Sequence, residues 1–180
     1  MSRLPKLTRN LLLLGVLLAG GLGAATALEV GEQAPEFMLP ATTSGNISLS
    51  QFRGRKLVLL EFYMGDFIPT CVANLSARKA DYGKFRELNV QILAISASYS
   101  TSQKAFTDAL DLPFPLLSDF PELKAIRSYG VLHASPIVAR RAFFLIDTQG
   151  VVRGRWLADD SAVFASEPIL QVAREVAGKP

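Results

Sequence analysis

Three short runs of aliphatic, β-branched and aromatic residues constrain the fold of this chain more than any other feature. They are KLVLLEFY at residues 56–63, VQILAIS at residues 90–96 and AFFLID at residues 142–147. Each run is nearly continuously apolar, which is typical of a central strand covered on both faces. Helical patterns lie between the runs, and strands that alternate with helices favour an α/β fold with parallel central strands.

The remaining elements complete a central mixed sheet flanked by helices. Residues 71–88 predict one helix, with Val72, Leu75 and Phe85 on its apolar face and Arg78 among the cations on the other. Further helices are expected at about residues 103–110, 121–129 and 168–177, and a short strand near residues 116–118. The tight turn at residues 147–150 adds an antiparallel pair. We expect one domain over residues 29–180.

The first 28 residues have the pattern of a targeting segment. Arg3, Lys6 and Arg9 precede an uncharged stretch, residues 11–28, which ends in the small residues 25–27. A basic start, an apolar middle and a small-residue end predict a secretory signal peptide, cleaved near Ala27. The alternative is an uncleaved anchor, a membrane tether through residues 11–28. Either reading places the protein outside the cytoplasm, in the periplasm or an equivalent compartment.

The charge balance argues against a nucleic-acid or anionic-membrane partner. The formal net charge is +3, but removal of the three N-terminal cations leaves 16 cations against 16 acids in the domain. The sequence has no phosphate-binding loop, no G-x-G-x-x-G motif and no zinc-ligand spacing. A metal role for His133, the only histidine, is disfavoured because no second histidine or cysteine accompanies it. We therefore expect neither a cofactor nor a metal.

Cys71 is the only cysteine and lies where an apolar strand gives way to a helix. A single cysteine cannot form an intramolecular disulfide, although exported proteins usually pair their cysteines. The positive first turn of a helix favours a thiolate, which is the nucleophilic form. A buried and inert cysteine is the alternative, and position alone leaves both interpretations open.

Four ordered motifs relate the chain to a known family. They are A-P-x-F at residues 34–37, L-x-x-[FY]-[RK]-G-[RK] at residues 49–55, F-Y-x-x-D-F at residues 62–67 and R-x-x-F-x-I-D-x-x-G at residues 141–150. Over roughly residues 29–157 the chain resembles the peroxiredoxin family, specifically its alkyl hydroperoxide reductase / thiol-specific antioxidant branch. The resemblance implies a thioredoxin-like fold and a thiol-dependent peroxidase activity.

The same resemblance implies roles for individual residues. Cys71 falls at the position of the peroxide-attacking cysteine, and Arg141 at that of the arginine that stabilises the thiolate and polarises the peroxide. A fixed cation would also stabilise charge on the leaving oxygen. The backbone N–H groups of Thr70 and Cys71 are placed to bind a peroxide oxygen. Peroxide is the implied substrate, an external thiol or thioredoxin-like protein the implied reductant, and a homodimer an assembly to be tested.

The loop before Cys71 departs from the family pattern P-x-x-x-[TS]-x-x-C. Met64 replaces the proline and Ile68 replaces the hydroxyl residue, while Asn74 stands where a glutamate is frequent. Ile68 offers no hydrogen bond, and an apolar neighbour opposes thiolate formation. Loss of such a transition-state hydrogen bond costs ~10²–10³ in rate. We therefore expect a peroxidase weaker than relatives that keep the hydroxyl.

Two other functions remain open at this point. The first is a non-catalytic binding or redox-sensor module on the same fold, in which Met64 and Ile68 record the loss of activity. The second is a tethered thiol–disulfide reductase, which is disfavoured because residues 68–74 contain no C-x-x-C pair. Glu61, in an apolar strand, is expected to pair with a cation, and four phenylalanines are expected to form an apolar wall near the site: Phe62, Phe67, Phe143 and Phe144.

Overall fold

The computed structural model describes residues 28–43, 45–134 and 137–178. The predicted signal peptide or anchor, residues 1–28, therefore lies outside the described residues except for Leu28, which is buried in the core. In the part of the chain that the structure describes, none of the helices is both long and apolar enough to cross a membrane.

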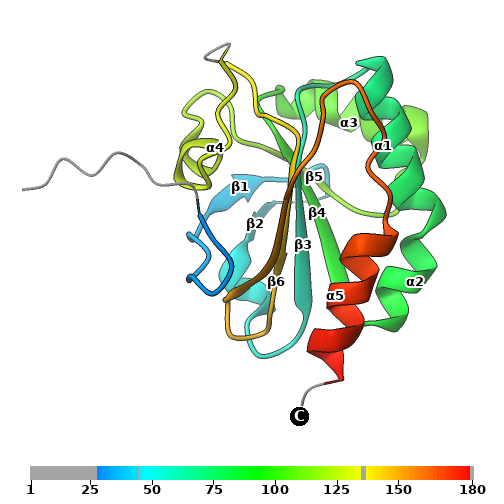
Figure 1. Cartoon of the computed structure of the whole chain (residues 1–180). Coiled ribbons are helices and arrows are strands. Elements are labelled where there is room, and N and C mark those ends of the chain that lie inside the picture. Colours follow the sequence, from blue (N-terminus) through cyan, green and yellow to red (C-terminus); the bar gives the residue numbers. More distant parts are fainter. Residues whose placement is uncertain (1–27, 44, 135–136, 179–180) are drawn as a thin grey trace, which may run out of the picture.

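A five-stranded mixed sheet forms the centre of the domain (Figure 1), in the order β5-β4-β3-β6-β7. Its strands are β3 (Leu57–Phe62), β4 (Val90–Ser96), β5 (Leu116–Ser118), β6 (Ala142–Ile146) and β7 (Val152–Leu157). Strands β3, β4 and β5 are parallel, whereas β6 is antiparallel to both β3 and β7. The three apolar runs thus form the three middle strands, as the sequence predicts. The expectation of parallel central strands is wrong for β6, which runs antiparallel to β3. A separate hairpin pairs β1 (Met38–Pro40) with β2 (Asn46–Ser48).

Helices cover both faces of the sheet. They are α1 (Pro69–Ala80), α2 (Tyr82–Glu87), α3 (Ser100–Leu110), α4 (Lys124–Ser128) and α5 (Glu167–Ala177), with a 3₁₀ turn at Leu49–Phe52. Figure 1 shows α1, α2 and α5 along one face, and α4 with the β1–β2 hairpin on the other. Helices α1, α2, α3 and α5 all contribute to the core of the first face, through Leu75, Phe85, Phe106 and Ile169.

The alternation of side chains along β3 decides which residues can reach Cys71. Leu59 and Tyr63 belong to the same core cluster as Cys71, whereas Phe62 belongs to the cluster on the opposite face. The expectation of a four-phenylalanine wall is therefore wrong. Only Phe143 lies in the Cys71 cluster; Phe144 shares the face of Phe62, and Phe67 has a left-handed backbone (φ 58°) and is 55% exposed.

The predicted helix over residues 71–88 is also corrected. It begins two residues earlier, at Pro69, and breaks at Asp81 into α1 and α2. Asp81 and Gly83 both have low helix propensity, and the Asp81 carboxylate pairs instead with Lys84 at 2.8 Å. Arg78, expected on the exposed face, is fully buried because Glu61 of β3 lies opposite it.

Candidate active site

Cys71 lies in the first turn of α1, just beyond the carboxyl end of β3. Pro69 begins the helix, where a residue without an N–H loses no hydrogen bond, and Ile68 at the N-cap supplies no side-chain cap. The first N–H groups of a helix have no intrahelical acceptor, so this turn presents positive dipole ends beside the thiol. Cys71 itself is fully buried, so the site is closed rather than open to solvent.

The structure brings Arg141 to Cys71 across 70 residues of sequence. The Arg141 Nη2 lies 3.6 Å from the Cys71 Sγ and donates toward it. The other terminal nitrogen, Nη1, donates to the carbonyl oxygens of Asp159 (2.9 Å) and Ala162 (3.4 Å). Arg141 is only 1% exposed. A buried cation held by neutral oxygens keeps its charge available to an anion at the sulfur.

Thr70 contributes its side chain to this arrangement, in addition to the backbone N–H that the sequence singled out. Its Oγ1 accepts a hydrogen bond from the Arg141 Nη2 at 3.1 Å. The same nitrogen therefore faces a hydroxyl and the thiol together. Sequence reasoning missed this hydroxyl because it looked for one only at residue 68.

The loop that leads into α1 is held by a polar network. The Tyr63 hydroxyl donates to Asp66 Oδ1 (2.9 Å), and the Ser102 hydroxyl donates to Asp66 Oδ2 (2.6 Å). Gln103 donates to the Tyr63 oxygen at 3.3 Å. Burial and the neighbouring Asp66 raise the pKa of Tyr63, which therefore stays a neutral donor. The Asp66 carboxylate therefore holds the loop through the Tyr63 and Ser102 hydroxyls.

Met64 and Ile68 are half-buried and pack against the apolar cluster that contains Cys71. Neither carries a group that can hydrogen-bond to the thiol. The predicted pocket residues Met64, Ile68 and Thr70 thus all lie near Cys71 or in its loop, and of the three only Thr70 contributes a polar side chain.

A segment that the sequence did not single out covers the site. We call residues 158–166, between β7 and α5, the strap. Asn74, buried in α1, donates from Nδ2 to the carbonyl oxygens of Thr70 (2.7 Å) and Ala162 (3.2 Å), and its Oδ1 accepts the N–H of Phe164 (2.9 Å). Phe164 also stacks on Phe143, with ring centroids 4.8 Å apart. The strap therefore closes over α1 through specific bonds.

Arg78 fastens the end of the strap and pairs with Glu61. Its terminal nitrogens donate to the Ser166 hydroxyl and the Phe164 carbonyl oxygen. Its Nε lies 3.3 Å from the Glu61 Oε2, in a geometry that makes an ion pair but no hydrogen bond. The spacing of Cys71, Asn74 and Arg78, three and seven residues apart on one helical face, is the signal that could have found these contacts.

Burial gives Glu61 unusual acid–base properties. Desolvation raises its pKa from the ordinary 4.5 to about 7, although the guanidinium groups of Arg78 and Arg141 act in the opposite direction. The expectation that Glu61 pairs with a cation is confirmed by the contact with Arg78.

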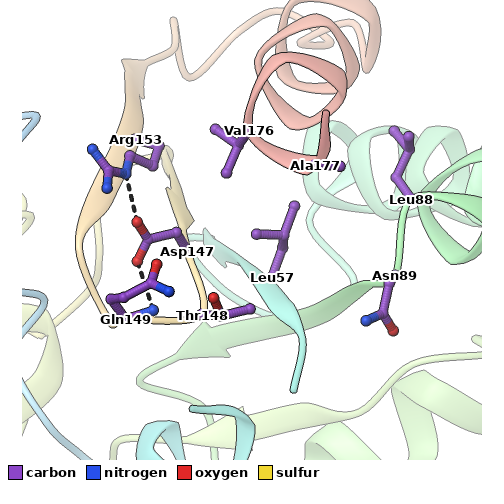
Figure 2. Close-up of a pocket in the computed structure, with 9 residues that line it drawn as sticks. All are labelled: Leu57, Leu88, Asn89, Asp147, Thr148, Gln149, Arg153, Val176 and Ala177. Atoms are coloured by element: carbon purple, nitrogen blue, oxygen red, sulfur yellow. Dashed lines mark hydrogen bonds and ion pairs between the residues drawn. The ribbon is translucent and has the colours of Figure 1, made fainter. Parts of the chain in front are cut away.

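Two surface hollows lie away from Cys71. The one in Figure 2, about 600 Å³, lies at the opposite end of β3 and is lined by Leu57, Asn89, Asp147, Arg153, Val176 and their neighbours. Its Asp147 carboxylate is already bound to Arg153 at 2.5 Å and to the N–H of Gln149 at 2.9 Å. The other, about 500 Å³, borders β1 and α4. Neither hollow includes Cys71 or Arg141 among its lining residues.

The described residues contain no group of three or more histidine, cysteine, aspartate or glutamate side chains arranged to hold a metal ion. His133 lies instead beside the strap, with its Nε2 3.6 Å from the Asp160 Oδ2.

Comparison with known proteins places this chain in a family. Residues 30–155 match the model of the AhpC/TSA family. The peroxiredoxin tpx1 of Schizosaccharomyces pombe is 36% identical over 137 residues, which cover 71% of this chain and 70% of that protein. A putative peroxiredoxin of Entamoeba histolytica is 28% identical over 159 residues, which cover 82% of this chain and 67% of that protein.

Solved structures agree with the sequence comparison. The reduced 2-Cys peroxiredoxin of Plasmodium vivax superimposes with a TM-score of 0.75 at 30% identity, over 80% of this chain and 79% of that one. AhpC of Enterococcus faecalis, at 23% identity and a TM-score of 0.76 over 83% of this chain and 92% of that one, shares the fold. The chain therefore belongs to the AhpC/TSA family of peroxiredoxins, thiol-dependent peroxidases on a thioredoxin-like fold.

Proposed function

We propose that this protein is an exported one-cysteine peroxidase that reduces hydrogen peroxide or small organic hydroperoxides through a sulfenic acid at Cys71. The observation that carries the proposal is the contact between the Arg141 Nη2 and the Cys71 Sγ at 3.6 Å, in the first turn of α1. A buried guanidinium and a helix N-terminus both favour the thiolate. Both also stabilise negative charge on the oxygen that leaves.

The reaction proceeds in two stages. The Cys71 thiolate attacks one peroxide oxygen, an S–O bond forms as the O–O bond breaks, and the leaving oxygen takes a proton to become water or an alcohol. The sulfenic acid then reacts with an external thiol, which releases water and leaves a mixed disulfide. A second thiol releases the Cys71 thiol. The sequence holds no other cysteine, so the reductant is a separate molecule, either a small thiol or a thioredoxin-like protein.

Two features point to a slower enzyme than relatives with a hydroxyl at position 68. Met64 and Ile68 place apolar groups in the approach loop, and Cys71 is fully buried beneath its surroundings. Peroxide therefore reaches the sulfur only when covering side chains move. The same features support a second candidate, a redox-sensor or binding module that reacts with peroxide too slowly for turnover.

The decisive experiment measures sulfenic acid formation. The purified protein is mixed with stoichiometric hydrogen peroxide, and the sulfenic acid is trapped with a dione reagent and followed by mass spectrometry. The proposal predicts a rate well above that of free cysteine, abolished by Cys71→Ser and strongly reduced by Arg141→Met. A wild-type rate no faster than free cysteine would favour the sensor or binding module.

The location of the protein is a separate proposal that rests on residues 1–28. Their basic start and uncharged stretch support export, with either cleavage near Ala27 or retention as a tether. Cell fractionation combined with the intact mass of the recovered protein distinguishes the two outcomes, and recovery from the cytoplasm contradicts both. Light scattering of the purified protein tests whether it forms a homodimer.

A further inference from the structure

Four buried groups that can carry charge lie on the same side of the sheet. Glu61, Arg78 and Cys71 are fully buried, and Arg141 is 1% exposed. They come from β3, α1 and the residue that precedes β6. Charges in such a closed space are poorly screened, so they interact more strongly than charges at the surface do.

The two arginines of this cluster have different partners. Arg78 faces the Glu61 carboxylate at 3.3 Å, while its terminal nitrogens bind the strap. The Arg141 guanidinium contacts two carbonyl oxygens, the Thr70 hydroxyl and the Cys71 sulfur. Within the described residues no carboxylate lies within ion-pair distance of that guanidinium. The cluster thus holds two cations and one carboxylate, and Cys71 is the group able to provide the second negative charge.

We propose that Glu61 is a positioning residue that controls the ionisation of Cys71. Its carboxylate neutralises Arg78, and its negative charge makes a second negative charge, the Cys71 thiolate, less favourable beside the two guanidiniums. The inference rests on the proposed function only in treating Cys71 as the nucleophile. It assigns a role in the peroxidase site to a strand residue that does not touch the sulfur.

The surroundings of Glu61 support a direct electrostatic effect. Buried charged and titratable groups on this side are Arg78 and Cys71 of α1, Arg141, and Tyr63, which follows β3. Asp81, at the end of α1, also interacts electrostatically with Arg78. The other surfaces here are apolar, and they are formed by Ala94 of β4, Phe143 of β6 and Ile169 of α5. The Asp159 carbonyl oxygen accepts a hydrogen bond from the Arg141 guanidinium, and the Asp160 carboxylate accepts one from the Arg141 backbone N–H. Glu61 is therefore the fully buried carboxylate that can offset the positive charge of the two arginines.

The test titrates Cys71 without any peroxide. Because the chain has one cysteine, its thiolate is followed by ultraviolet absorbance against pH, with the Cys71→Ser protein as the blank. Glu61→Gln removes the negative charge that Glu61 carries above its pKa of about 7, so the midpoint of thiolate formation should fall by about one pH unit. Glu61→Asp keeps the charge and should restore the wild-type midpoint. Glu167→Gln, which removes an exposed carboxylate paired with Arg174 on α5, should leave it unchanged.

A purely structural role gives a different result. If Glu61 only held Arg78 and the strap, Glu61→Gln would loosen Arg141 and leave the midpoint unchanged or raise it, and either result overturns the proposal. A variant that unfolds is titrated in sucrose, which favours the folded state.

The double variant Glu61→Leu/Arg78→Leu provides a second test, since apolar replacement of a buried ion pair is often tolerated. Above the Glu61 pKa of about 7 it removes one charge of each sign, so the midpoint of thiolate formation should stay within about half a unit of wild type. A larger displacement overturns the proposal. Because no step requires turnover, a protein with no peroxidase activity can still support or refute this role.

Discussion

At the scale of single residues, the main question is which group can hydrogen-bond near Cys71 when position 68 has no hydroxyl. The structure shows a different hydroxyl nearby, because Thr70 Oγ1 and Cys71 Sγ share the same Arg141 nitrogen, at 3.1 Å and 3.6 Å. A threonine hydroxyl can accept from the arginine and still donate to a peroxide oxygen. We therefore expect Thr70 to supply part of the hydrogen bonding that Ile68 cannot provide.

Replacement of Thr70 tests this role. Thr70→Val keeps the shape of the side chain and removes only the hydroxyl. We expect sulfenic acid formation to slow by about tenfold or more, because one hydrogen-bonding group is lost from the transition state. Stopped-flow fluorescence or mass spectrometry measures the rate. Thr70→Ser should keep most of the activity, and equal rates for the valine and serine variants would show that the hydroxyl has no role.

The opposite change at position 68 should increase the rate. Ile68→Thr introduces a hydroxyl at the N-cap of α1, three residues before Cys71, and should accelerate sulfenic acid formation by about tenfold or more. Ile68→Val is the matched control, since valine has the size of threonine without its oxygen. If the valine variant gains as much as the threonine variant, relief of packing rather than hydrogen bonding explains the gain.

At the scale of elements, the strap is the part of the site most open to testing. Asn74 binds it through Ala162 and Phe164 and has 1% exposure, so its hydrogen bonds are buried. Asn74→Ala should lower the free energy of unfolding by about 1–3 kcal/mol, because buried groups of the strap lose their partners. It should also speed the reaction of Cys71 with a bulky aromatic disulfide reagent, measured under native conditions.

The control for this experiment is Val163→Ala, at an exposed strap position. It should change neither stability nor labelling by a measurable amount. Equal labelling of wild type and Asn74→Ala, with the expected loss of stability, would mean that reagents reach Cys71 by another route.

The elements also show how far sequence reasoning reaches. The strands β3, β4 and β6 could be predicted because each is a continuous apolar run, and the family motifs joined Arg141 to Cys71. The break at Asp81 and the burial of Arg78 could not be predicted from periodicity, because periodicity describes a single helix and not the elements that pack against it. Arg78 is buried because Glu61, on a neighbouring strand, faces it. The strap depends on contacts 86 to 90 residues apart, and no local pattern encodes them.

At the scale of the whole molecule, the Glu61–Arg78 pair joins the central sheet to α1 and, through Arg78, to the strap. Both side chains are fully buried. The ionisation of Glu61 therefore affects folding as well as the site, since any difference in its pKa between folded and unfolded protein makes stability depend on pH.

The sign of this dependence follows from the raised pKa. Folded protein binds the Glu61 proton up to a pKa of about 7, whereas unfolded protein releases it near the ordinary 4.5. The stabilisation is complete below about 4.5 and is lost as pH rises through about 7, so the Glu61 contribution lowers the free energy of unfolding by up to a few kcal/mol across this window. Urea unfolding at about pH 5 and pH 8 measures it.

The double variant Glu61→Leu/Arg78→Leu should lose this component, while a variant without the exposed Lys104–Asp108 pair should keep it. An identical pH dependence in the wild type and the double variant would contradict the assignment, because the remaining titrating groups would then account for all of it.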